Sequence, residues 1–181
     1  MHSPVFADHT PDSAPPAARS TMEATARRMG YLPAAVARLA TSPHLLKGFL
    51  TLSATFEDTT LDPLAREVVI LTMATGNECH ICVAMHTAKL RALDADPELV
   101  SALRERRALP DERLEAVRQF TLRVLATAGA VPDEELHAFL DRGHTPQQAL
   151  EVVLGIGTYT LSTLANRLTR APLDEQLKCH A

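Results

Sequence analysis

The sequence predicts an all-α domain, and three observations lead to this prediction. Of its 181 residues, 46% are hydrophobic, which is enough to fill one core without disulfide cross-links. From about Ser20 onward the apolar residues recur every three or four positions, and the alternating pattern of β-strands is absent. Proline and glycine divide the chain into segments of helical length. We therefore expect a compact multi-helix domain of about eight helices.

The first half of the chain contains expected helices that begin at proline or at a polar capping residue. Proline is favoured in the first helical turn, because its missing N–H would have no partner there, and a preceding Ser or Asp can cap the free N–H groups. In chain order these helices are expected at 20–28, in a short segment from 33, at 43–56 and at 63–76.

The second half repeats these start signals. Asn77 is the expected N-cap of a helix that runs to about Leu93 and carries two cysteines. Gly155 and Gly157 lie inside the last long helix, where we expect them to mark close helix packing. The remaining helices are expected in a segment opened by Asp96 and Pro97, at 110–129, at 132–143 and from 146 through 164.

Composition sets the expected domain limits. Residues 1–18 carry four prolines among small polar residues and are expected to form a flexible N-terminal arm. A single helical domain is expected at 19–176, and a flexible C-terminal tail at 177–181. No signal-peptide pattern opens the chain, so we expect a cytoplasmic protein. The net charge of −4, without clustered Lys and Arg, argues against a nucleic-acid partner, and no apolar run is long enough for a membrane span.

Cys79, Cys82 and His86 form the most informative pattern in the chain. The spacing places the three side chains near one face of a helix. A permanent structural disulfide is disfavoured in the cytoplasm, so paired thiols there are more often catalytic, redox-sensing or metal-bound. The third cysteine, Cys179, lies two residues from the end and is expected to be a free, exposed thiol.

Glu67 is the one carboxylate of a segment, 66–74, that is otherwise apolar nearly all round. Such a helix should be buried, and a buried carboxylate must find a hydrogen-bond partner or take up a proton. Glu67 is therefore a candidate acid or base, although it could instead point outward or pair with Arg66.

The cysteine pair can support a dithiol cycle. Oxidation of one thiol by a peroxide gives a sulfenic acid, and attack by the second thiol releases water and closes a disulfide. Residue patterns leave the order open. A helix start at Asn77 would lower the pKa of Cys79, whereas Cys82 lies four residues before the base His86.

The spacing of Glu67, Cys79, Cys82 and His86 resembles the active-site signature of the alkyl hydroperoxidase D-like (AhpD-like) group in the carboxymuconolactone decarboxylase superfamily. The similarity covers about residues 28–174. It implies an all-α homo-oligomer without metal or other cofactor, in which Cys82 attacks the peroxide, Cys79 resolves the intermediate, and Glu67 and His86 relay protons. The further matching motifs are Gly30-x-x-Pro33, Ser42-Pro43, the lead-in from Leu61 to Glu67, and Leu164 to Arg167.

One position departs from this signature. Established peroxidases of the group tend to carry a histidine directly before the second cysteine, but Ile81 stands there and His80 precedes it. A shift of one residue turns a helical side chain by about 100 degrees, so His80 is expected to face elsewhere.

The function expected from these features is a thiol-dependent peroxidase that acts on hydroperoxides and is recycled by an external thiol reductant. Three alternatives stay open at this level. They are a metal site built from Cys79, Cys82, His86 and Glu67, a redox-sensing oligomer without turnover, and a decarboxylase or lactone-processing enzyme.

Overall fold

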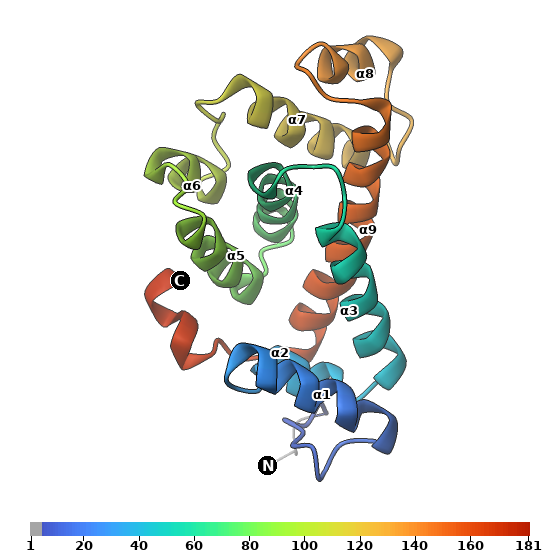
Figure 1. Cartoon of the computed structure of the whole chain (residues 1–181), viewed down its shortest axis with the longest axis vertical. Coiled ribbons are helices and arrows are strands. Elements are labelled where there is room, and N and C mark those ends of the chain that lie inside the picture. The colour runs from blue at the N-terminus through green and yellow to red at the C-terminus, as the bar shows by residue number, and fades with distance from the viewer. Residues whose placement is uncertain (1–4) are drawn as a thin grey trace.

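The structure is a computed structural model that describes residues 5–181, and all the regular secondary structure in this range is helical. This confirms the predicted all-α fold. Ten helices occur in the described residues, and eight of them have seven or more residues (Figure 1). They are α1 (Pro16–Met29), α2 (Ala34–Leu39), α3 (Pro43–Glu57), α4 (Pro63–Gly76), α5 (His80–Ala92), α6 (Pro97–Arg104), α7 (Glu112–Ala126), α8 (Asp133–Leu140), α9 (Pro146–Thr169) and the 3-10 helix η1 (Glu175–His180).

Most helix starts follow the predicted capping signals, but the start of α5 does not. The side chains of Ser42, Asp62 and Thr145 accept backbone N–H bonds at the starts of α3, α4 and α9. The cap predicted at Asn77 is wrong, because Asn77 ends α4 and Cys79 is the N-cap of α5. Short-range signals could not separate the two helices, since Asn suits both ends.

Parts of the predicted arm and tail pack against the body of the protein. Helix α1 begins at Pro16 rather than near residue 20, and Ala14 and Ala18 are buried. Asp8 pairs with Arg38 at 2.6 Å. At the other end, Leu177 of η1 is buried, and η1 packs against α5. Residues 1–4 of the predicted arm lie outside the described residues.

Helix α4 occupies the centre of the molecule. It contacts α5, α6, α7 and α9, and Figure 1 shows it enclosed by these elements. Ten of its 14 residues are buried, as expected from its nearly unbroken apolar sequence. A central buried helix can hold a carboxylate only where a partner helix supplies polar groups, and α5 does so for Glu67.

Gly155 lets α9 approach α3 and α4 closely. A Cβ atom at Gly155 would lie 2.7 Å from the ring of Phe56 and 2.9 Å from Cγ1 of Val69, and both side chains are fully buried. At Gly157, which faces outward, an added Cβ would meet nothing within 4 Å. The packing role predicted for both glycines therefore holds only for Gly155.

We expect Gly155→Ala to destabilise the protein by up to about 2 kcal/mol, because overpacking costs about 1–3 kcal/mol and the better helix propensity of Ala returns about 1 kcal/mol. Gly157→Ala is the matched control and should stabilise the protein by up to about 1 kcal/mol. Urea titration of both variants measures the difference. Equal stabilisation by both would contradict this account of the α9 contact.

None of the helices in residues 5–181 combines the length and the apolar character that crossing a membrane requires.

Candidate active site

The two cysteines of the predicted site lie at the start of α5. The chain leaves α4 through Glu78, whose left-handed φ of 51° turns it sharply, and the Cys79 N–H then donates to the Ala74 carbonyl at 2.9 Å. Cys82 follows one helical turn later, so its sulfur lies 2.6 Å from the sulfur of Cys79. Both are free thiols, close enough for a disulfide bond of about 2.05 Å to form with little backbone movement.

A cavity of about 620 Å³ lies beside this pair, between α1, α2, α3, α5 and α9. Cys82 and His86 line it, but Cys79 does not. Both sulfurs are deeply buried, with Cys82 5% exposed and Cys79 1% exposed. A substrate in the cavity therefore meets Cys82. The rest of the wall is mostly apolar and includes Met29, Val36, Leu39, Phe49, Leu50 and Met85.

Glu67 and His86 form a buried pair behind the cavity. Glu67 is fully buried rather than pointing outward, and its Oε2 lies 2.7 Å from Nδ1 of His86. On its other side Oε1 lies 3.1 Å from Nζ of Lys89, which also pairs with Glu57 near the surface. Glu57, Lys89, Glu67 and His86 thus form a chain of polar contacts that runs from α3 into the core.

The charge state of Glu67 follows from these contacts. Burial alone would raise its pKa, but the positive charges and hydrogen bonds of His86 and Lys89 outweigh burial and lower it. Glu67 is therefore an ionised carboxylate at neutral pH. It orients His86 through the 2.7 Å contact with Nδ1, so the imidazole is the group left to exchange protons with the cavity.

The two thiols share one negative charge. The hydrogen bond from Cys82 is the main cause that lowers the pKa of Cys79 to about 7, with help from backbone N–H groups at the start of α5 and against the effect of burial. The same contact, with burial and the charge of Cys79, raises the pKa of Cys82. The pair therefore ionises first at Cys79, although Cys82 faces the cavity.

Helix α9 supplies site residues to which no role was assigned from the sequence. The ring of Tyr159 meets the ring of His86 edge to face at 5.4 Å, and burial raises the pKa of Tyr159 to about 12. Nδ2 of Asn166 donates to the sulfur of Cys82 at 3.4 Å. Lys89, on α5 itself, could have been found as the residue three positions after His86 on the same helix face.

His80 is exposed, as expected from its shifted position, whereas Ile81 is buried and lines the cavity. Within residues 5–181, no group of three or more His, Cys, Asp or Glu side chains is placed to hold a metal ion. Glu67 binds both His86 and Lys89, and the thiols bind each other. This arrangement suits proton-coupled thiol chemistry.

The segment that carries this arrangement is similar to a known family. Residues 43–121 match the carboxymuconolactone decarboxylase family. The match begins with α3, ends within α7 and contains all four predicted site residues, so the resemblance noted in the sequence is confirmed. Among curated proteins, none matches the chain.

Solved structures share the fold of the whole chain. An uncharacterized peroxidase-related protein from Ralstonia eutropha JMP134, which has an alkylhydroperoxidase AhpD core, superposes with a TM-score of 0.84 at 19% identity and covers 98% of this chain and 96% of its own. An uncharacterized peroxidase-related protein from Silicibacter sp. TM1040 gives 0.81 at 18% identity, with coverage of 97% and 95%.

A third solved structure also has this fold. It is a cysteine-to-alanine variant of the debrominase Bmp8 in complex with 2,3,4-tribromopyrrole, with a TM-score of 0.78 at 12% identity and coverage of 99% and 96%. At such identities the three likenesses show the fold alone.

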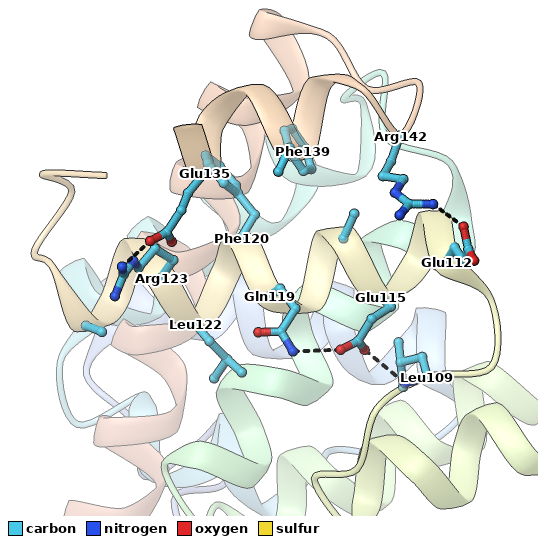
Figure 2. A pocket seen from close by; sticks show the side chains of 13 residues that line it. Leu109, Glu112, Glu115, Gln119, Phe120, Leu122, Arg123, Glu135, Phe139 and Arg142 are labelled. Carbon is cyan, nitrogen blue, oxygen red and sulfur yellow. Dashed lines mark hydrogen bonds and ion pairs between the residues drawn. The ribbon is translucent and has the colours of Figure 1, made fainter. Parts of the chain in front are cut away.

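A second hollow, of about 550 Å³, lies between α7 and α8 and away from the cysteines (Figure 2). The ion pair of Arg123 with Glu135 joins the two helices across it, and Glu112 of α7 pairs with Arg142, which follows the end of α8. Glu115 is engaged by Gln119 and by the Leu109 N–H. Its carboxylates are already paired, so we assign this hollow no chemistry.

Proposed function

We propose that the protein is a thiol-dependent peroxidase that reduces organic hydroperoxides through a disulfide between Cys82 and Cys79. The observation that carries this proposal is the contact of the two sulfurs at 2.6 Å, with only Cys82 in the wall of an apolar cavity. His86, held by Glu67, lines the same cavity. The nucleophile and the proton donor thus face one space, and the resolving thiol lies directly behind the nucleophile.

The reaction begins with transfer of the Cys82 proton to the Cys79 thiolate across their short contact. The Cys82 thiolate then attacks the terminal oxygen of the hydroperoxide, an S–O bond forms and the O–O bond breaks. The departing alkoxide takes a proton from His86 and leaves as an alcohol. Cys79 next attacks the sulfenic acid, and the sulfenic hydroxyl leaves as water with the Cys79 proton.

Two further statements belong to this proposal. An external thiol donor reduces the disulfide in the cytoplasm, where thiols are kept reduced. The working form is a homo-oligomer, because large apolar side chains stand exposed on the outer face of α9 and a second copy could cover them. These are Leu150, Val153, Leu164 and Leu168.

Reductive dehalogenation of a small aromatic compound is the second candidate. The same dithiol could replace a carbon–bromine bond by a carbon–hydrogen bond and release bromide, with both electrons coming from the thiols as they form the disulfide. The observation that favours it is the cavity itself, which places Phe49 and Tyr159 in one space with Cys82. The bromopyrrole complex of the debrominase shows that this fold can bind such a compound.

A thiol count on reduced Cys179→Ser protein tests both candidates. We expect one equivalent of cumene hydroperoxide to remove two thiols per chain within seconds to minutes, whereas one equivalent of tribromopyrrole leaves them intact. With dithiothreitol as the thiol donor, we also expect catalytic turnover, measured as continued consumption of the peroxide. Thiol loss with bromide release only from the pyrrole would favour the second candidate. Reversible oxidation without turnover would favour the redox sensor.

A further inference from the structure

Asn166 comes from α9 and touches the reacting sulfur of the proposed peroxidase. Its Nδ2 donates to Sγ of Cys82 at 3.4 Å, and the residue is only 7% exposed. It also lines the cavity, next to Cys82 and Ser162. A hydrogen bond from an amide favours the thiolate over the thiol, so this contact prepares Cys82 for attack.

The other end of the same amide is unpaired. Oδ1 of Asn166 is shielded from solvent and has no hydrogen-bond partner among residues 5–181. Leaving a buried acceptor without a partner destabilises the folded protein, because the atom loses its bond to water and gains none in return. Gln148, an equally buried amide on the same helix, shows the usual arrangement, because its Nε2 bonds to the Thr60 carbonyl at 3.1 Å and its Oε1 accepts from the Thr145 N–H at 3.1 Å.

The position of Oδ1 limits what its partner can be. Bulk water does not reach the atom, so the missing donor must come from a group held in the site. Nδ2 of the same amide donates to the sulfur of Cys82. A hydroxyl group attached to that sulfur is therefore close enough to donate to Oδ1. A hydroperoxide delivers such a hydroxyl to Cys82.

We propose that the Asn166 amide binds the transferred oxygen, with Nδ2–H on the sulfur of Cys82 and Oδ1 accepting the O–H that arrives on that sulfur. This inference rests on the proposed peroxidase function. As the S–O bond forms and the O–O bond breaks, the alkoxide leaves with the His86 proton. The hydroxyl stays on the sulfur with its proton directed to Oδ1 until Cys79 displaces it as water.

The proposal makes Asn166 a determinant of substrate class. Hydroperoxides carry an O–H on the atom that the thiolate attacks, so they satisfy Oδ1 as they react. A brominated ring carries no donor at the attacked atom and leaves Oδ1 unpaired. The amide therefore favours oxygen transfer over dehalogenation at Cys82.

The test uses protein in which Cys82 is the single cysteine, with Cys79→Ser and Cys179→Ser. Alkylation of Cys82 by iodoacetamide reports the thiolate alone, and sulfenic acid formation by cumene hydroperoxide, trapped with dimedone, reports oxygen transfer. We expect Asn166→Leu to slow alkylation by about tenfold and oxidation by about 100-fold or more. Asn166→Asp keeps an acceptor, so its two rates should fall by similar factors.

Asn77→Leu is the matched control, because it removes an amide bond to Thr163 of α9 at 2.8 Å without touching a sulfur, and both rates should stay unchanged. If Asn166→Leu does not fold, Asn166→Ala makes the same prediction. Equal loss of both rates in these apolar variants would overturn the proposal. A parent protein that is alkylated but not oxidised by the hydroperoxide would overturn the peroxidase function, and this inference with it.

Discussion

Cys82→Ser is expected to slow the hydroperoxide-dependent loss of thiols by more than about 100-fold, because it removes the attacking thiolate. Cys79→Ser should keep the first oxidation and lose only the disulfide. The physical reason is access. Cys82 lies in the cavity wall and Cys79 behind it, so a peroxide in the cavity reaches one sulfur and not the other.

Acidity by itself would indicate the opposite order. The hydrogen bond from Cys82 lowers the pKa of Cys79 to about 7, so the thiolate of the resting pair sits on the inner sulfur. The contact of 2.6 Å resolves this conflict, because it lets one proton move from Cys82 to Cys79 before attack. Oxidation requires that the pair of thiols has lost one proton, whichever sulfur then carries the negative charge. The rate of oxidation should therefore rise as the pH increases through about 7.

Stopped-flow oxidation of the two single variants, with dimedone trapping and intact mass, measures this prediction. In Cys79→Ser the sulfenic acid should accumulate and be trapped on Cys82, then overoxidise with excess peroxide. In Cys82→Ser, any dimedone adduct should form far more slowly than in the wild type. The opposite pattern, with peroxide consumed at the wild-type rate in Cys82→Ser and not in Cys79→Ser, would make Cys79 the nucleophile.

Glu67→Gln is expected to slow disulfide formation by about 100-fold, because a neutral amide takes the negative charge of Glu67 away from His86, the proposed proton donor. The carboxylate lies 2.7 Å from His86 and is fully buried, so no water can replace it. The side chains keep the same shape, so a loss of rate would report the charge rather than the volume of Glu67.

The same variant should lose stability at neutral pH. We expect about 1–3 kcal/mol, less than the 3–5 kcal/mol of a fully buried pair, because Lys89 is partly exposed and keeps Glu57 as a partner. The pKa of Glu67 is lowered in the folded protein, so its contribution is complete above its unfolded pKa of about 4.3. The stability difference between Glu67→Gln and wild type should shrink as the pH falls below that value.

Urea midpoints across this pH range, with the single-turnover rate at neutral pH, provide the measurement. Lys89→Met is the control. It removes the positive charge beside Glu67 without touching His86, so it should lower the stability of the protein more than its rate of oxidation. A Glu67→Gln variant that reacts at the wild-type rate would exclude Glu67 from the proton relay.

Some of the site could be predicted from local patterns. Helix starts at Pro43, Pro63 and Pro146 agree with the structure, because capping and proline act within one turn. The burial of Glu67 followed from the apolar residues around it on α4. The spacing of Cys79 and Cys82 placed two sulfurs one helical turn apart, which brings them into contact at the start of a helix.

The sequence by itself determined the all-α fold, the burial of Glu67 and the pairing of the two thiols, since each depends on neighbours within a few residues. Only the tertiary structure decided the rest. It set the cap at Cys79, the contact of Lys89 with Glu67, and the amide of Asn166 on a sulfur 84 positions away. It also decided that, of the two paired cysteines, only Cys82 lines the cavity, because the cavity wall is built by helices that meet only in the packed molecule.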